Sequence, residues 1–191
     1  HSFCFRILRE EWRAQGVHYD VLDDRRQKRI MEEILGPKGL NLDETVITPA
    51  EALARIGRLK NDLVTPDQYA AVAPMEDHLV EVYHAYEKRK AAERLVDFDD
   101  MLLLCYRLLS ENPAILAAWQ RRWTWVLVDE FQDTNRAQWE IIRLLAAPED
   151  NLFVVGDDWQ AIYGWRGARP ELIIRFRDYY PDARGIVLAT N

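Results

Sequence analysis

Little cysteine and no long apolar run are present in this chain of 191 residues. The two cysteines, Cys4 and Cys105, lie far apart and form no C-x-x-C pair, so neither a zinc site nor a disulfide framework is implied. Reduced, buried thiols are expected instead. The four histidines also lack the spacing of metal ligands: His1, His18, His78 and His84. The absence of a signal peptide and of an apolar span of about 18 residues predicts a soluble, cytoplasmic protein with no membrane partner.

An excess of positive charge is also absent. The formal net charge is −7, with 32 acidic residues against 25 lysines and arginines. This balance argues against a uniformly basic coat, so any contact with nucleic acid must be local. Hydrophobic residues make up 49% of the chain, which is enough to bury the core of one or two compact domains.

What the chain does contain is an apolar run that ends in two acids. Residues 125–128, WVLV, predict a parallel strand that is buried and covered on both faces. Asp129 and Glu130 follow at its carboxyl end, where ligands bind in open α/β sheets. An Asp there can hold hydrated Mg²⁺, and a Glu one residue later can orient or deprotonate a water molecule. The pattern is a Walker B signature, and the alternative is a strand capped by solvated acids.

A second acidic strand end follows downstream. The apolar stretch NLFVVG at residues 151–156 precedes DDWQAIYGWRGA at residues 157–168. Together with DEFQDTN at residues 129–135, it resembles motifs II and III of the UvrD/Rep/PcrA family of superfamily 1 DNA helicases, and the spacing matches. Three further segments resemble other motifs of that family: HSFC at residues 1–4, IGRLKN at 56–61 and VDFDDML at 96–102. The resemblance therefore spans essentially the whole chain.

The resemblance implies an α/β fold, namely a partial RecA-like parallel sheet of the P-loop NTPase class with an all-helical insertion. Residues 1–18 and 95–191 are expected to form the RecA-like part, and residues 19–94 the helical insertion domain. The sequence agrees, because helices alternate with apolar strands in the last third of the chain. No strand signal is found between residues 17 and 95. We also expect helices at 74–94 and 170–179 and a third strand at 185–189.

The resemblance also implies chemical roles. Asp129 is expected to bind Mg²⁺ and Glu130 to activate the attacking water, while Gln160 senses the γ-phosphate of ATP. The alternative for Gln160 is a turn residue that hydrogen-bonds within its own loop. The cofactors implied are thus ATP and Mg²⁺. Residues expected to connect the two motifs during nucleotide coupling are Gln132, Asp133 and Asp157. For Gln132 and Asp133 a second interpretation is open, that they cap the next helix with Thr134.

The partners implied are single-stranded DNA and junctions of single-stranded and duplex DNA. The residues that would contact them are His1, Ser2, Phe3, Lys60, Asn61, Tyr163, Trp165 and Arg166. Tyr163 and Trp165 flank a glycine, so their rings could stack on bases, although a pair of core aromatics is the alternative. Lys60 belongs to a local basic cluster that could contact phosphates. For the basic run at 88–90, a solvated helix face is an equally good interpretation.

One further acidic feature has a simpler interpretation than a metal site. Asp97, Asp99 and Asp100 precede a strongly apolar helix expected at residues 101–109. An N-cap and first-turn acids, which the helix dipole favours, explain them better than a metal site does.

A phosphate-binding loop is missing. No G-x-x-x-x-G-K-[ST] sequence occurs, and the eight glycines are scattered. In the family this loop precedes the motif found at His1, and a second RecA-like domain supplies arginines that stabilise the transferred phosphoryl group. We therefore expect an excised piece, inactive alone, of an enzyme that couples ATP hydrolysis to 3′-to-5′ translocation and duplex unwinding in repair or recombination. The alternatives are a fragment of a helicase–nuclease subunit and a non-catalytic DNA- or protein-binding module.

Overall fold

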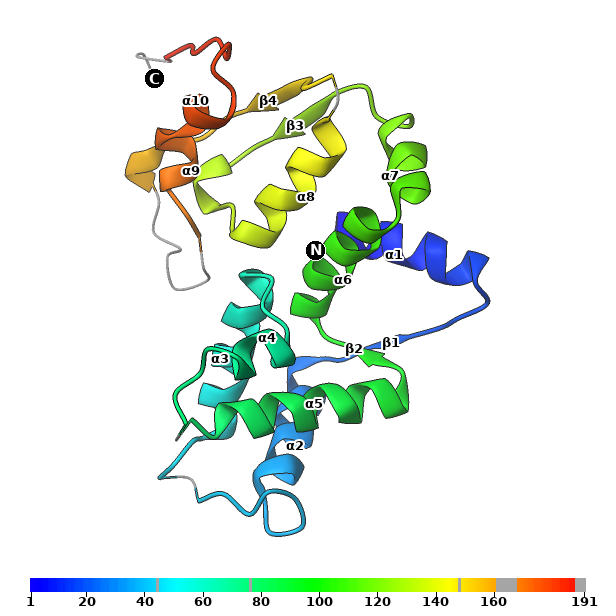
Figure 1. Ribbon diagram of the computed structural model, residues 1–191, viewed down its shortest axis with the longest axis vertical. Helices are drawn as coiled ribbons and strands as arrows, with labels where there is room; N and C mark the ends of the chain where they lie inside the picture. Colours follow the sequence, from blue (N-terminus) through cyan, green and yellow to red (C-terminus); the bar gives the residue numbers. More distant parts are fainter. Residues whose placement is uncertain (44, 76, 148, 161–167, 188–191) are drawn as a thin grey trace.

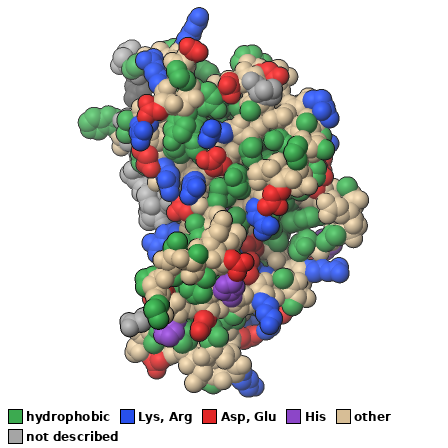
Figure 2. Space-filling model, in the orientation of Figure 1, with side chains coloured by type: hydrophobic (Ala, Val, Ile, Leu, Met, Phe, Trp, Pro, Cys, Tyr) green, Lys and Arg blue, Asp and Glu red, His purple; other side chains and the backbone are tan. Residues whose placement is uncertain are grey.

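Helices dominate the lower half of the molecule in Figure 1, and helices with short strands form the upper half. This computed structural model describes residues 1–43, 45–75, 77–147, 149–160 and 168–187. Within them, two parallel two-stranded sheets lie among the helices, which confirms the predicted α/β class. Basic and acidic side chains intermingle on the face shown in Figure 2, as the modest negative charge suggests.

The lower half is built from four capped or amphipathic helices: α2 (Asp24–Leu35), α3 (Pro49–Asn61), α4 (Pro66–Ala70) and α5 (Leu79–Glu93). Thr48 and Thr65 cap α3 and α4, because each hydroxyl accepts a hydrogen bond from a backbone N–H three residues on. The apolar faces meet in one core, which includes Leu22, Ile30, Met31, Ile34, Ile56, Leu79, Val82, Tyr83 and Tyr86.

The chain enters and leaves this helical half through adjacent strands. β1 (Asp20–Val21) pairs in parallel with β2 (Leu95–Val96). The expectation of no strand between residues 17 and 95 is therefore wrong. β1 is two residues long and exposed, so it carries no apolar pattern that periodicity could detect. The proposed division into domains at residues 19 and 94 stays a prediction.

The upper half begins with helices that pack around a second core: α1 (Ser2–Ala14), α6 (Phe98–Glu111), α7 (Pro113–Gln120) and α8 (Arg136–Ala146). A reciprocal capping box between Asp97 and Asp100 starts α6, as the sequence suggested. Cys4 and Cys105 are free and buried in this core. A hydrogen bond with Cys4 and burial together raise the pKa of the Cys105 thiol.

The second sheet carries the two acidic strand ends. β3 (Val126–Val128) and β4 (Leu152–Val154) pair in parallel, with Val126 opposite Leu152. Figure 1 shows α8 below this sheet, and two short helices, α9 (Glu171–Ile174) and α10 (Phe176–Tyr179), lie at its end. Core residues on the covered face include Phe131, Trp139, Leu172, Val128, Leu152 and Val154.

The other face of this sheet is open, so the predicted cover on both faces is wrong. Leu127 and Phe153 point to that face and are 71% and 54% exposed. The reason is alternation: successive side chains of a strand point to opposite faces, and the described helices pack on one of them.

Three element boundaries also differ from expectation. α5 starts at Leu79, not 74, because a turn precedes it in which the Asp77 carboxylate accepts from the Leu79 N–H. The helix expected at 170–179 is broken at Arg175 into α9 and α10. Residues 185–187 are not in a strand, and 188–189 lie outside the described residues.

Among the described residues, no individual helix has the length and apolar character needed to cross a membrane. α6 and α7 meet that test as a pair, although the chain bends by 103° between them.

Candidate active site

Asp129 and Glu130 lie exposed where β3 ends. Asp129 Oδ1 accepts a hydrogen bond from the Glu130 N–H at 2.9 Å. Glu130 has φ 51° and ψ 43°, which is a left-handed conformation. This conformation is energetically unfavourable for any residue other than glycine. Residues in such conformations are often found at functional sites, and the surrounding structure keeps them in that conformation. Both acids are thus fixed at the strand end predicted to bind ligand.

A short 3₁₀-helix, η1 (Phe131–Asp133), turns the chain after these acids and begins a line of hydrogen bonds. Gln132 Nε2 donates to Glu130 Oε2 at 2.7 Å, and Gln132 Oε1 accepts from the Asp157 N–H at 3.0 Å. Asp157 Oδ2 in turn accepts from Gln160 Nε2 at 2.8 Å. Gln160 lies in a second 3₁₀-helix, η2 (Asp158–Gln160). The predicted base and the predicted phosphate sensor are therefore connected through two intervening residues.

Gln132 therefore bridges the two strand ends, and the cap of α8 lies elsewhere. The side chain that accepts from the third helical N–H of α8 is Asn135, with Gln138 completing a capping box. The interpretation in which Gln132 and Asp133 cap the helix with Thr134 is thus wrong. Use of the Gln132 bridge in nucleotide coupling stays a prediction.

Gly156, at the end of the second apolar stretch, makes room for this bridge. A Cβ on Gly156 would lie 2.6 Å from Gln132 Oε1 and 3.2 Å from the Gln132 backbone N. Any side chain there would displace Gln132, so the close approach of the two loops requires glycine.

A pocket of about 520 Å³ opens beside the acids. Its polar lining includes Asp129, Glu130 and Asp133, and its apolar lining includes side chains of β3, α1, α6 and α8. The buried Oδ1 atom of Asp133 has no hydrogen-bond partner among the described residues. Hard carboxylate oxygens and an unsatisfied acceptor suit Mg²⁺, so the residues fit the metal that the sequence implies. Asp129 at the strand end would hold it, and Asp133 lines the same pocket.

The start of α1 also reaches this pocket. His1 and Phe3 line it, so two of the three predicted DNA contacts of this segment lie near the acids. Ser2 is exposed beside them. The His1 ring meets the Phe98 ring edge-on at 6.5 Å, and the Phe3 ring lies 5.0 Å from that of Trp123. The predicted DNA contacts Tyr163, Trp165 and Arg166 lie outside the described residues.

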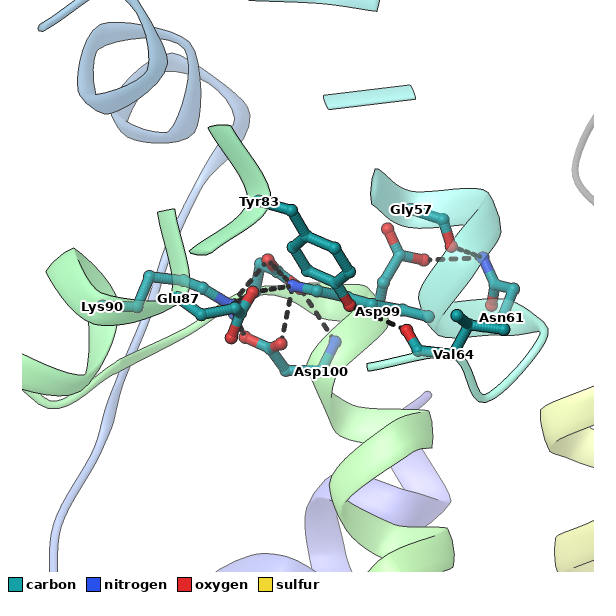
Figure 3. Close-up of polar contacts among 10 residues, drawn as sticks. Gly57, Asn61, Val64, Tyr83, Glu87, Lys90, Asp99 and Asp100 are labelled. Carbon is teal, nitrogen blue, oxygen red and sulfur yellow. Dashed lines mark hydrogen bonds and ion pairs between the residues drawn. The ribbon is translucent and has the colours of Figure 1, made fainter. Parts of the chain in front are cut away.

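Lys60 is not at a surface. Its side chain is fully buried, and Nζ lies 2.9 Å from Glu87, 2.6 Å from Asp97 and 2.7 Å from Asp100. Lys90 of α5 joins the same group, which we call the buried ion cluster: Lys60, Glu87, Lys90, Asp97 and Asp100. Figure 3 shows the Glu87 and Asp100 carboxylates turned toward Lys90. The two ammonium groups lie 5.2 and 4.7 Å from the Tyr86 ring centre.

The predicted phosphate contact of Lys60 is therefore contradicted, because three carboxylates surround its ammonium group away from solvent. Burial alone would lower the pKa of Lys60, but those carboxylates raise it well above its usual value. Burial alone would likewise raise the pKa of Asp97, but Lys60 and Lys90 lower it below its usual range. Asn61 also points inward and hydrogen-bonds to Gly57, Asp99 and Asn135.

The capping interpretation of Asp97 and Asp100 is confirmed. Carboxylate oxygens of Glu87, Asp97 and Asp100 do gather within 4.8 Å of one another. The ammonium groups of Lys60 and Lys90 already lie against them. Sequence reasoning missed Lys90, although it shares the buried helical face of Leu79, Val82, Tyr83 and Tyr86, and that spacing was the available signal.

Comparison with known proteins gives consistent matches. Residues 1–181 match the family described as the UvrD/REP helicase N-terminal domain. Over 195 residues the chain is 38% identical to the ATP-dependent DNA helicase PcrA of Leuconostoc citreum. It is 36% identical to proteins of the same description from Staphylococcus aureus (strain Mu50 / ATCC 700699) and Staphylococcus epidermidis. Each match covers 100% of this chain and 26% of the relative, so the chain spans about a quarter of their length.

Proposed function

The chain belongs to the UvrD/REP helicase N-terminal domain family, and from this premise we propose that it is the part of an ATP-dependent DNA helicase that carries the hydrolytic carboxylates. The observation that carries the proposal is the line of hydrogen bonds from Glu130 through Gln132 and Asp157 to Gln160. The same hydrogen bonds hold the carboxylate that activates water, Glu130, and the amide that senses the phosphate, Gln160. Loss of the γ-phosphate after hydrolysis can therefore change the position of residues bonded to the base.

In this proposal each acid has one task. Asp129 would hold Mg²⁺, which when bound would supply positive charge next to the phosphates of ATP. Glu130 accepts a proton from the attacking water. Gln132 keeps the Glu130 carboxylate in place through the 2.7 Å hydrogen bond. Gln160 donates to the γ-phosphate and loses that partner after hydrolysis, and Asp157 passes the change to Gln132.

The remaining parts of the machinery come from elsewhere in the whole protein. We propose that a phosphate-binding loop and a second RecA-like domain complete the site, and that residues 1–18 with 95–191 form the RecA-like part around the insertion 19–94. His1, Ser2 and Phe3, with Tyr163, Trp165 and Arg166, are the proposed contacts to single-stranded DNA. A cytoplasmic location and a role in repair or recombination belong to the same proposal, as does 3′-to-5′ movement.

The proposal is tested with the whole protein and tailed DNA duplexes. We expect ATP hydrolysis to need Mg²⁺ and to be accelerated by single-stranded DNA. Duplexes with a 3′ single-stranded tail should be unwound, and those with a 5′ tail should not. Unwinding from the 5′ tail would overturn the polarity, and a lack of DNA-stimulated hydrolysis would overturn the function. Mg²⁺-dependent shortening of the DNA strands would favour the nuclease alternative.

A further inference from the structure

The last turn of α3 contacts both of the loops that carry the proposed site. Three consecutive residues, Lys60, Asn61 and Asp62, each bind a different part of the molecule, and we call them the α3 joint. Lys60 belongs to the buried ion cluster, which fixes α3 to α5 and to the start of α6. Figure 3 shows Asn61 and Asp99 turned toward each other near this cluster.

Asn61 can adopt one amide orientation in this setting. Its Nδ2 donates to the Gly57 carbonyl at 2.9 Å and to Asp99 Oδ1 at 3.0 Å, and both partners can accept but not donate. Its Oδ1 is left to accept from Asn135 Nδ2 at 2.8 Å. Asn135 is 6% exposed and caps α8, directly after η1. Asn61 therefore joins the helical half to the loop that follows Glu130.

Asp62 makes the corresponding link to the other loop. Its Oδ1 lies 2.7 Å from the Arg169 guanidinium. Arg169 follows the segment that begins at η2, and its backbone N–H donates to the Thr134 carbonyl at 3.0 Å. The end of α3 thus contacts both Asn135 and Arg169, and Arg169 contacts Thr134. A movement of either loop changes a contact with α3.

We propose that the α3 joint transmits the state of the nucleotide loops to the helical half, and that this link sets how strongly DNA accelerates ATP hydrolysis. This inference rests on the proposed function. Asn61 and Asp62 touch neither substrate nor reacting atoms, so they are positioning residues. The geometry supports the link because three successive residues contact three parts of the molecule. Lys60 contacts the start of α6, Asn61 contacts the cap of α8, and Asp62 contacts Arg169. A shift of α8 or of Arg169 against α3 would break the contact of Asn61 or of Asp62.

Asn135→Asp in the whole protein tests the first contact. Asp caps a helix as well as Asn does, so the acceptor for the Gln138 N–H is kept. The donor to Asn61 is lost, and a carboxylate oxygen faces its Oδ1. We expect the acceleration of ATP hydrolysis by single-stranded DNA to fall about 5-fold or more, which is the lower end of typical coupling between sites. Hydrolysis without DNA should stay close to that of the unmodified protein, whereas the melting temperature should fall, because the new carboxylate is nearly buried and faces an oxygen.

Two further sets of variants separate a link from a merely structural role. Asn61→Ala and the double variant Asn61→Ala with Asn135→Asp should lose no more acceleration than Asn135→Asp alone, because the link between Asn61 and Asn135 is already lost in each of them. Arg169→Asp should also lower the acceleration, and adding Asp62→Arg should restore it by reversing the ion pair. If the unmodified protein shows no acceleration by DNA, the proposed function fails as well. If it does and Asn135→Asp and Arg169→Asp keep it, the α3 joint alone is overturned.

Discussion

Replacing Glu130 with Gln in the whole protein is expected to lower the rate of ATP turnover by about 10²–10⁴-fold, the usual contribution of a general base. Gln has the same shape, and its side-chain oxygen can still accept the hydrogen bond from Gln132. Nucleotide binding should therefore persist. Phosphate release at saturating ATP and DNA measures turnover, and a fluorescent ATP analogue measures binding.

Glu149→Gln is the matched control for that experiment. Glu149 is exposed on the turn between α8 and β4, so the same change of charge is made away from the acids. Its turnover should equal that of the unmodified protein. Turnover by Glu130→Gln within a few-fold of the unmodified rate would mean that another group activates the water, and the roles proposed for Gln132 and Gln160 would lose their basis.

Replacing Lys60 with Met should produce the largest loss of stability. Met keeps most of the apolar volume, but Glu87, Asp97 and Asp100 are then left with Lys90 as their cation. Removing one member of a buried ion pair typically costs about 3–5 kcal/mol. Hydrogen exchange of α3, α5 and α6 amides in the whole protein measures this loss as a protection decrease of roughly two to three orders of magnitude.

The loss should depend on pH in a defined window. The raised pKa of Lys60 means that its stabilisation is complete below the usual value of 10.5 and is lost as the pH rises through the folded-state pKa. The lowered pKa of Asp97 means that its stabilisation is complete above the usual value of 3.8 and is lost as the pH falls through the folded-state pKa. The difference between Lys60→Met and the unmodified protein should therefore be largest at neutral pH and shrink below pH 3.8.

Lys28→Met is the control for this second prediction. Lys28 is 65% exposed on α2 and pairs with Glu32 at 3.8 Å, so the same substitution disturbs no buried charge. Exposed pairs of this kind contribute little. Equal protection in Lys60→Met and Lys28→Met would show that Lys60 is not needed to neutralise the buried carboxylates.

Local signals were sufficient for much of the fold. Asp97 correctly predicted the start of α6, because capping depends on residues within one turn. The acids Asp129 and Glu130 were placed correctly at a strand end for a similar reason, since an apolar run and its end are adjacent in sequence. β1 could not be found in this way, because two exposed residues make no pattern.

The partners of Lys60 and Asn61 required the folded chain. Lys60 follows Arg58 by two residues, so in the sequence it resembles an exposed basic residue. Its partners Asp97 and Asp100 nevertheless lie far along the chain, Asp97 being 37 positions away. The link between Asn61 and Asn135 spans 74 positions. No local rule pairs two asparagines at that distance. The open face of the sheet was also missed, because an apolar strand indicates burial without showing what covers each side.

Exchange of the metal tests the central claim, that the strand-end carboxylates form the hydrolytic site, most directly. In the whole protein, Asp129→Cys replaces a hard oxygen ligand with a soft thiolate, which binds Mg²⁺ poorly and Mn²⁺ or Cd²⁺ better. Because losing even a partner that orients a ligand costs about 10–100-fold, hydrolysis with Mg²⁺ should fall at least that far. We predict that, when Mn²⁺ or Cd²⁺ replaces Mg²⁺, the hydrolysis rate of Asp129→Cys approaches the rate of the unmodified protein measured with the same ion. An equal loss with all three ions would contradict metal binding by Asp129 and, with it, the assignment of this site.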